Sequence, residues 1–368
     1  MEQTYAEEMK ERNELSVSFI VPVYNVPRRL LQRCLLSIIR AASVLKSYEI
    51  IVIDDGSDHL YSPASVVEQI AGAPICYVRN EVNKGLSVSR NIALNLSKKE
   101  YVQFVDADDF LIASNEQQLF SLCVDTRADL IAFRMKSVCT EDSDNTILTD
   151  IPKHSLQKLV CYDGTGPDYA AHHNLCASVC AYLFRRNLVA DTLRFTPGLL
   201  REDEEFTTLL FLRTQHLVVT SIICYAYYQR SGSIMQTRSD KHVMRLLNDA
   251  MLTASKLSVL ASHYQGMQAA MLCRKSAMLT SDILFNMMQW LPHYADFRKV
   301  YKRLQEQNLL PIKYMKNSDV KHRVFRFITS TLMGASLCWV IYRLYAFCFS
   351  NSQKDKYSWQ NSNENNKE

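Results

Sequence analysis

The stretch Tyr101-Val-Gln-Phe-Val-Asp-Ala-Asp-Asp-Phe110 decides how we interpret the fold. Residues 101–105 are mostly apolar and β-branched, which is typical of a short buried strand. Asp106, Asp108 and Asp109 follow directly. Crowded carboxylates repel each other, and a divalent ion held between them and a phosphate relieves that repulsion. An Asp-rich helix cap is the plain alternative, and these residues alone leave both interpretations open.

Strands and helices alternate in the chain that precedes this stretch. Apolar runs predict strands at residues 16–24, 49–54 and 75–79, and each is followed by a segment whose apolar residues have helical spacing. Such alternation predicts right-handed crossovers and a mainly parallel α/β sheet. In sheets of this kind, ligands bind at the carboxyl ends of the strands.

Polar residues follow each of the four predicted strands. They are Tyr24 and Asn25, Asp54 and Asp55, Asn80 and Lys84, and Asp106 and Asp108. We therefore expect one site at this edge of the sheet. The chain has no G-x-G-x-x-G after the first strand and no G-x-x-x-x-G-K-S/T, which argues against a dinucleotide fingerprint and a P-loop.

Four motifs in this order resemble those of family 2 glycosyltransferases. They are Phe19-Ile-Val-Pro-Val-Tyr-Asn25, Val52-Ile-Asp-Asp-Gly-Ser57, Asn83-Lys-Gly-Leu-Ser-Val-Ser-Arg-Asn91 and Phe104-Val-Asp-Ala-Asp-Asp-Phe110. The resemblance covers roughly residues 16–230. It implies a GT-A fold, in which a nucleotide-sugar-binding half and an acceptor-binding half share one Rossmann-like sheet. It also implies a divalent cation and inversion at the anomeric carbon.

Roles at the first site follow from this resemblance and from the chemistry of a nucleotide-sugar donor. Asp106 and Asp108 would supply hard oxygen ligands to Mg²⁺ or Mn²⁺. The resemblance makes Asp108 the firmer ligand and lets Asp106 reach ribose or metal. Asp55, or Asp54 beside it, would accept a hydrogen bond from the ring N–H of uracil, which favours a UDP donor.

Other residues are expected to complete the donor site. Tyr24 offers its ring or hydroxyl to the nucleoside, near the Pro22 carbonyl. Lys84 and Arg90 are the cations expected at the base edge or phosphate, although a helix-start lysine and a solvated arginine would explain them structurally. The complete expected donor set is Pro22, Tyr24, Asp54, Asp55, Asn80, Lys84, Arg90, Asp106 and Arg230.

A second acidic cluster, Glu202-Asp203-Glu204-Glu205-Phe206, lies farther along the chain. An acidic first turn would suit the dipole of a helix. The cluster also matches the family's E-D-x-x-F motif, whose Asp is the general base, so we expect Asp203 as base and Glu202 as its orienting neighbour. Arg201 stands where the family often has His or Gly, which puts a metal ligand there in doubt. Arg230-Ser-Gly-Ser-Ile234 resembles the loop that closes over the donor diphosphate.

The last third of the chain carries no catalytic signature. Basic residues at 321–326 precede sixteen largely uncharged residues, 327–342, fewer than the roughly twenty that a membrane-spanning helix needs. A helix on the inner membrane surface, a core or dimer-packing helix, and a span all stay open for residues 320–349. The polar tail 351–368 is expected to be disordered.

Length and composition set the remaining expectations. We expect a polar lead at 1–14, a GT-A domain at 15–235 divided at residue 112, and a helical region at 236–350. A net charge of +4 is too small to indicate a nucleic-acid partner. Eleven scattered cysteines indicate reduced thiols in a cytoplasmic protein, with the inner face of the membrane as an open alternative. The N-terminus has no apolar signal segment.

The expected function is metal-dependent, inverting transfer of a sugar from a nucleotide diphosphate to a hydroxyl. The acceptor would be a glycan or a lipid-linked molecule in cell-surface polysaccharide synthesis. One alternative is a catalytically inactive scaffold or glycan-binding protein, which should have lost its carboxylates, whereas Asp55, Asp106, Asp108 and Asp203 are present. A nucleotidyltransferase is another, but it would normally show a glycine- and basic-rich loop after the first strand.

Overall fold

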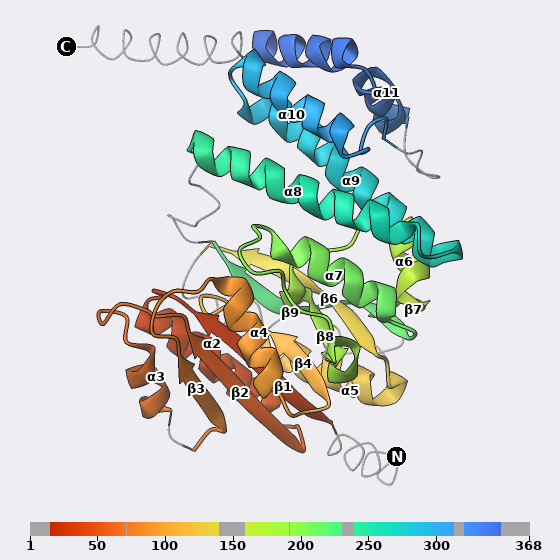
Figure 1. The fold of residues 1–368 in the computed structure, drawn as a ribbon. Coiled ribbons are helices and arrows are strands. Elements are labelled where there is room, and N and C mark those ends of the chain that lie inside the picture. Colours follow the sequence, from red (N-terminus) through yellow and green to blue (C-terminus); the bar gives the residue numbers. More distant parts are fainter. Residues whose placement is uncertain are drawn as a thin grey trace, which may run out of the picture. The chain divides into compact units, whose positions relative to one another are not determined.

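The computed structural model describes residues 15–70, 72–139, 159–190, 192–229, 239–312 and 320–346. The chain divides into two compact units, Met1–Thr237 and Arg238–Glu368. The first unit contains all the strands that the structure describes, and the second consists of helices (Figure 1).

A nine-stranded sheet forms the centre of the first unit. The strands are β1 (Ser16–Val23), β2 (Ser47–Asp54), β3 (Ile75–Arg79), β4 (Tyr101–Phe104), β5 (Phe110–Leu111), β6 (Leu130–Val138), β7 (Val160–Gly164), β8 (Tyr182–Arg185) and β9 (Leu217–Tyr228). Their order is β3-β2-β1-β4-β8-β6-β9-β5, with β7 paired to β9.

The first half of the sheet is parallel. β1 lies between β2 and β4, and β2 pairs with β3, all in parallel register. The apolar residues of β1 are buried because helices cover both faces of the sheet, as the continuous hydrophobic run predicts. This arrangement brings the ends of β1, β2, β3 and β4 to one edge.

The second half of the sheet is mixed. β8 enters antiparallel between β4 and β6, and β9 pairs parallel with β6 but antiparallel with β5 and β7. The predicted GT-A-type α/β fold with a helical C-terminal region is confirmed. Four of the eight strand pairs are antiparallel, however, so "mainly parallel" describes only the first half.

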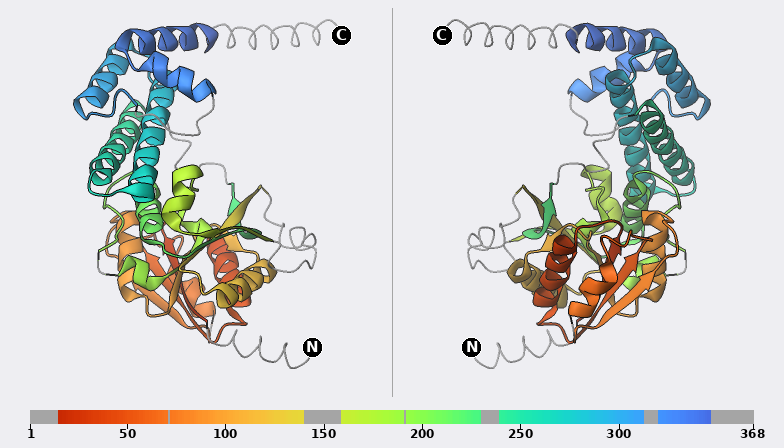
Figure 2. Two further views of the ribbon diagram at one scale, coloured as in Figure 1. Left: turned by 90° about the vertical axis from the view of Figure 1, so that its right-hand side faces the viewer. Right: turned by 90° about the vertical axis from the view of Figure 1, so that its left-hand side faces the viewer.

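Helices lie on both faces of this sheet (Figure 2). They are α2 (Arg28–Ala42), α3 (Pro63–Gln69), α4 (Leu86–Leu96), α5 (Ala113–Thr126), α6 (Gly166–His172) and α7 (Glu202–Arg213), with 3-10 turns η2 (Val179–Ala181) and η3 (Arg186–Val189). The apolar stripe of α2 packs beside α5 and β5, and α4 packs on β1 and β2.

Residues 163–167 connect two elements, since they end β7 and begin α6. Thr165 caps α6, since its hydroxyl accepts the Asp168 N–H at 3.2 Å. The segment Arg230-Ser-Gly-Ser-Ile234 lies outside the described residues.

The second unit contains α8 (Asp240–Ala261), α9 (Gly266–Trp290), α10 (Tyr294–Glu306) and α11 (Val320–Thr329), followed by a helix at Leu332–Ala346. The uncharged segment expected at 327–342 is therefore broken, with a bend of 113°. Thr331 starts the second helix, because its Oγ1 accepts the Gly334 N–H at 3.2 Å. Among the described helices, none is long and apolar enough by itself to cross a membrane, although the bent pair Arg323–Thr329 and Leu332–Ala346 passes that test together.

Candidate active site

The loop after β4 presents two carboxylates outward and one inward. Asp106 and Asp108 are partly exposed, whereas Asp109 is buried. The hydroxyl of buried Tyr225 on β9 holds the loop, since it accepts the Asp106 N–H at 3.0 Å and donates to Asp109 Oδ2 at 2.7 Å. The backbone N–H of Tyr228 donates to Asp109 Oδ1 at 2.7 Å.

The pKa of Asp109 reflects its buried position beside Asp106. Burial, followed by the charge of Asp106, raises the pKa of Asp109 to about 8, against the opposing hydrogen bonds from Tyr225 and Tyr228. Asp109 therefore holds its proton near neutral pH and is a structural member of the loop. Asp106 and Asp108 are left as the carboxylates that face outward.

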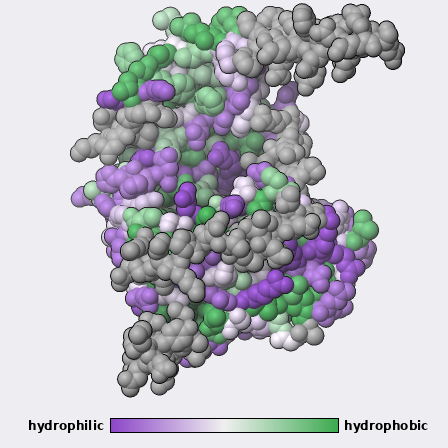
Figure 3. All heavy atoms as spheres, turned by 180° about the vertical axis from the view of Figure 1, so that it is seen from behind, coloured by the Kyte–Doolittle hydropathy of each residue, from purple (hydrophilic) through white to green (hydrophobic). Residues whose placement is uncertain are grey.

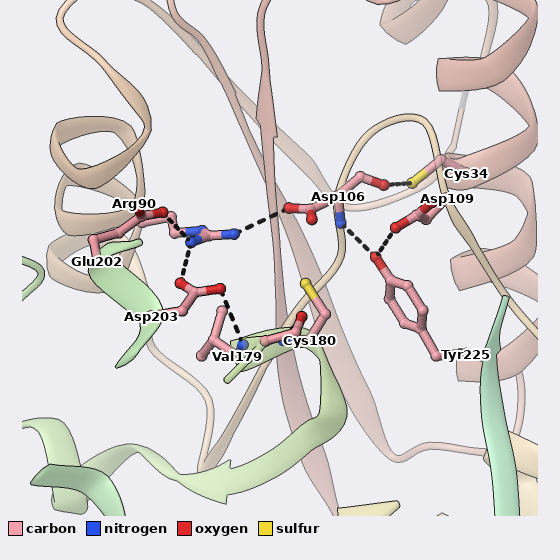
Figure 4. Close-up of polar contacts among 10 residues, drawn as sticks. Cys34, Arg90, Asp106, Asp109, Val179, Cys180, Glu202, Asp203 and Tyr225 are labelled. Carbon is pink, nitrogen blue, oxygen red and sulfur yellow. Dashed lines mark hydrogen bonds and ion pairs between the residues drawn. The ribbon is translucent and has the colours of Figure 1, made fainter. Parts of the chain in front are cut away.

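Arg90 on α4 joins this loop to the second acidic cluster (Figure 4). Its side chain is only 2% exposed. Nη2 donates to Asp106 Oδ1 at 3.1 Å, while Nη1 donates to Asp203 Oδ1 at 2.5 Å and to Glu202 Oε1 at 2.9 Å. Burial acts to lower the pKa of Arg90, but the Asp203 and Asp106 carboxylates outweigh it and raise the pKa above its usual range.

This position corrects both expectations for Arg90. Arg90 is neither a solvated arginine nor a cation available at the base edge, because its guanidinium donates hydrogen bonds to three carboxylates. The sequence does not reveal this role, since Arg90 and Asp203 are 113 residues apart. The structure thus brings Asp106, Glu202 and Asp203 together around one cation.

Asp203 lies in the first turn of α7, as the helix-dipole interpretation predicts, and its role as general base stays a prediction. Its Oδ2 accepts the Val179 N–H at 3.3 Å, and its side chain remains 18% exposed. Burial raises the pKa of Asp203 to about 6 against the lowering effect of Arg90, and Glu202 adds to the increase. A carboxyl group with this pKa is ionised near neutral pH yet accepts a proton readily.

Arg201, just before α7, forms an ion pair. Its Nη2 lies 2.7 Å from Glu204 Oε1. Because a guanidinium stays protonated and has no lone pair to offer, a metal ligand at this position stays in doubt.

Asp54 at the end of β2 accepts hydrogen bonds from other residues of the protein. Its Oδ1 accepts the Ser57 N–H at 2.8 Å, and its Oδ2 accepts from Tyr77 at 2.8 Å and from Arg79. Burial acts to raise its pKa, but these hydrogen bonds outweigh burial and lower it. Asp54 therefore holds the turn after β2, and its contact with uracil stays a prediction.

Asp55 is also buried, at 3% exposure, and it organises the next loop. Its Oδ1 accepts from Asn80 Nδ2 at 2.7 Å and from the Lys84 N–H at 2.9 Å, and its Oδ2 accepts the Gly85 N–H at 2.8 Å. Asn80 is thus a partner of Asp55 at the strand edge. The Lys84 side chain is exposed beside them.

The remaining expected donor residues lie at the same edge or outside the described chain. Pro22 is buried in β1 opposite Ile53, and Tyr24 is 46% exposed just after that strand. Arg230 lies outside the described residues. A contact of Tyr24 with a nucleoside stays a prediction.

The carboxylates of Asp106 and Asp108 suit a divalent cation that is held jointly by the protein and a bound ligand. No group of three or more His, Cys, Asp or Glu side chains placed to hold a metal occurs among the residues that the structure describes. Asp106 and Asp108 are partly exposed, and their carboxylate oxygens are hard ligands that Mg²⁺ and Mn²⁺ accept. Phosphates commonly complete such sites. Three carboxylates around Arg90 also leave an excess of negative charge.

Several supporting residues escaped prediction from the sequence. Tyr225 and the Val179 backbone position Asp106 and Asp203, and Tyr77 and Arg79 hold Asp54. All reach the site through contacts between distant segments. No local pattern of residues distinguishes them.

Sequence comparison identifies similar proteins. The family model described as Glycosyl transferase family 2 matches residues 18–193. The chain is 30% identical over 256 residues to "Glycosyltransferase GlyA" of Streptococcus pneumoniae, covering 67% of this chain and 35% of GlyA. It is 33% identical over 116 residues to "Poly(ribitol-phosphate) beta-N-acetylglucosaminyltransferase TarP" of Staphylococcus aureus, covering 31% of this chain and 35% of TarP. The matches thus span about a third of each relative.

Structural comparison supports the fold. The crystal structure of S. aureus TarS 1-349 in complex with UDP-GlcNAc has a TM-score of 0.60 and 19% identity, and the match covers 80% of each chain. At this identity, the likeness concerns the fold alone.

Proposed function

The chain belongs to glycosyl transferase family 2, and we propose on that basis that it is a metal-dependent, inverting glycosyltransferase with a nucleotide-diphosphate sugar as donor. Residues at the ends of β1, β2, β3 and β4 would hold the donor. Asp203 would act on the acceptor. The observation that carries this proposal is the Arg90 bridge between Asp106 on the donor side and Asp203 on the acceptor side.

The proposed reaction is a single displacement. Asp203 takes the proton of the acceptor hydroxyl while that oxygen forms a bond to the anomeric carbon. The bond from that carbon to the diphosphate oxygen breaks on the opposite face, and the nucleoside diphosphate leaves with the electron pair. Arg90 holds Asp203 in place and stabilises its ionised form, while Glu202 fixes the same guanidinium from its other side.

Asp106 and Asp108 would hold Mg²⁺ or Mn²⁺, which supplies positive charge to a departing diphosphate. The partial exposure of both carboxylates supports this assignment. Arg230 is retained as a proposed cation for the same diphosphate.

UDP is the donor nucleotide we propose. A carboxylate at the end of β2 suits the ring N–H of uracil, and we propose Asp55 for this contact. TarS is described in complex with UDP-GlcNAc, and TarP is named for transfer onto poly(ribitol-phosphate). By analogy, we propose an acceptor hydroxyl on a cell-surface polymer or its lipid-linked precursor.

A donor-hydrolysis screen tests this proposal. Purified protein is incubated with UDP-, GDP- and dTDP-sugars, with manganese or with EDTA, and released nucleoside diphosphate is measured. We expect release from at least one UDP-sugar, and its loss with EDTA. Release from none of the donors would contradict the proposed activity.

We also propose that the second unit contacts the cytoplasmic face of a membrane. Apolar side chains are exposed along one side of helix Leu332–Ala346 at Met333, Leu337, Val340, Ile341 and Leu344. Figure 3 shows hydrophobic side chains gathered on the C-terminal helices. Lys321 and Arg323 on α11 are exposed cations that suit anionic lipid.

A further inference from the structure

A groove of about 370 Å³ lies between α2 and the segment from β5 to the start of α5. Arg29, Arg33 and Arg40 line it from α2. Leu36, Phe110 and Ile112 supply an apolar surface, and none of the described lining residues is a carboxylate. The groove therefore combines strong positive charge with an apolar floor.

Arg33 is fixed in this groove. Its guanidinium lies over the rings of Phe110, at 4.4 Å, and Tyr228, at 4.9 Å, and its Nη2 donates to the Asp108 carbonyl at 3.0 Å. Its Nε and Nη1 are out of solvent and have no hydrogen-bond partner in the described chain. A cation that is desolvated without an ion-pair partner is costly, and a nearby anion would offset that cost.

The groove adjoins the proposed donor site. Arg33 contacts the backbone of Asp108, and the neighbouring Cys34 Sγ lies 3.7 Å from the Asp106 carbonyl oxygen. A ligand in the groove would thus lie next to the loop that carries the two proposed metal ligands. The arginines also extend along the helix, because Arg29 and Arg40 are eleven residues, roughly 16 Å, apart.

We propose that this groove binds the diphosphate of an amphiphilic acceptor, that is, a diphosphate joined to an apolar chain. Three guanidiniums match an anion larger than a single phosphate, and the apolar floor suits the start of the chain. An uncharged glycan would use neither feature. The inference rests on the proposed glycosyl transfer and narrows its acceptor class to a lipid-linked diphosphate.

Binding of farnesyl diphosphate tests the proposal. Titrations are done in EDTA, so that no metal can bridge the ligand to Asp106 and Asp108, and pyrophosphate and farnesol serve as the two halves of the ligand. We expect farnesyl diphosphate to bind at least about tenfold more tightly than either half. Equal affinity for farnesol, or for pyrophosphate, would overturn the amphiphile assignment.

Variants of the groove arginines test where farnesyl diphosphate binds. The double variant Arg29→Gln/Arg40→Gln should weaken farnesyl diphosphate binding by about tenfold or more, since it removes two charged contacts. Arg28→Gln is the matched control, because Arg28 is an exposed arginine on the same helix outside the groove, and it should change affinity less than about twofold. Equal affinity of the double variant and the wild type, or an equal effect of Arg28→Gln, would overturn the proposed location.

A parallel measurement separates this inference from the proposed function. UDP binding with manganese should be the same in the wild type, the double variant and Arg28→Gln. If the wild type binds farnesyl diphosphate in an arginine-dependent way but does not bind UDP, the proposed UDP-sugar donor is contradicted, and the proposed binding of a diphosphate in the groove is supported. If it binds UDP but not farnesyl diphosphate, the groove proposal fails alone.

Discussion

At the scale of single residues, Arg90 connects parts of the chain that have different proposed tasks. Asp106 follows β4, and Asp203 begins α7, yet both contact the same buried guanidinium. A change in charge at Asp106 should therefore alter the electrostatic environment of Asp203, the proposed base. Buried charge clusters are weak arguments for stability, so we interpret this one as a device that sets the ionisation of Asp203.

The first prediction concerns the pH dependence of transfer. Because the pKa of Asp203 is raised to about 6 and a general base must be ionised, kcat/KM should fall as the pH drops through about 6. Arg90 lowers the pKa of Asp203, so Arg90→Gln should move this acidic limb to higher pH. Arg90→Lys, which keeps the charge, should move it less. An Arg90→Gln profile that coincides with the wild-type profile would refute the coupling.

The second prediction concerns the proposed metal ligands. Asp108→Ala should weaken UDP binding in manganese by about tenfold or more and leave the weak binding in EDTA unchanged, because a metal ligand matters only when metal is present. Calorimetric titrations under both conditions measure this. Glu81→Ala, at an exposed carboxylate after β3, is the control and should leave both affinities unchanged. The same loss with and without metal would argue for a structural role of Asp108.

At the scale of elements, the loop after β2 depends on a glycine. Gly56 has φ +76°, and a Cβ there would lie 2.8 Å from the Val82 carbonyl carbon. The contacted segment continues to Lys84 and Gly85, whose N–H groups bind Asp55. Gly72 has a similar φ of +88° but open space around it.

The third prediction uses this pair. Both Gly56→Ala and Gly72→Ala meet an unfavourable backbone conformation, but only the former forces the 82–85 segment away from Asp55. We expect Gly56→Ala to lose roughly 1–3 kcal/mol more stability than Gly72→Ala, and to bind UDP more weakly. Thermal unfolding and calorimetry measure the two effects. Equal losses in both variants would show that the close approach is unimportant.

The strands of the parallel half could be predicted from the sequence, whereas the strand pairing of the mixed half could not. β1 to β4 are continuous apolar runs followed by polar residues, so local pattern is enough to find them and the edge they share. β8 enters the sheet between β4 and β6 through pairings across long stretches of chain, and β7 has alternating exposure without a strong apolar run. Contacts of this kind are decided by tertiary packing.

The same distinction applies to the candidate site. The carboxylates of both acidic clusters could be identified from their motifs, but their partners could not. Asp54 and Asp55 are adjacent and look equivalent in the sequence, and only the structure shows that Tyr77 and Arg79 occupy Asp54. The contacts of Arg90 with Glu202 and Asp203 likewise join segments that are more than a hundred residues apart.

At the scale of the whole molecule, the second unit exposes an apolar surface. Its described residues include exposed apolar side chains on Leu332–Ala346 but no group of side chains placed to hold a metal. The break at Ser330 divides the uncharged run, so the two helices can expose apolar faces without forming one straight span.

The fourth prediction follows from that surface. The protein should sediment with anionic phospholipid vesicles, and Leu337→Glu/Ile341→Glu should weaken this binding by roughly tenfold, because both side chains are 57% exposed on one side of the helix. Val259→Glu is the control, since Val259 is 61% exposed on α8. Equal binding of the Leu337/Ile341 variant and the wild type would remove the membrane proposal and leave the catalytic proposal intact.

The measurement that tests the central claim most directly is UDP release from a UDP-sugar by the wild type, Asp203→Asn and Glu205→Gln, with UDP affinity measured in parallel. Glu205 is the matched control, because it is a carboxylate of the same helix turn that binds Thr196 instead of Arg90. We predict that Asp203→Asn binds UDP normally but loses roughly 10²- to 10⁴-fold in turnover, while Glu205→Gln stays close to the wild type. Turnover by Asp203→Asn at the wild-type rate would contradict the account.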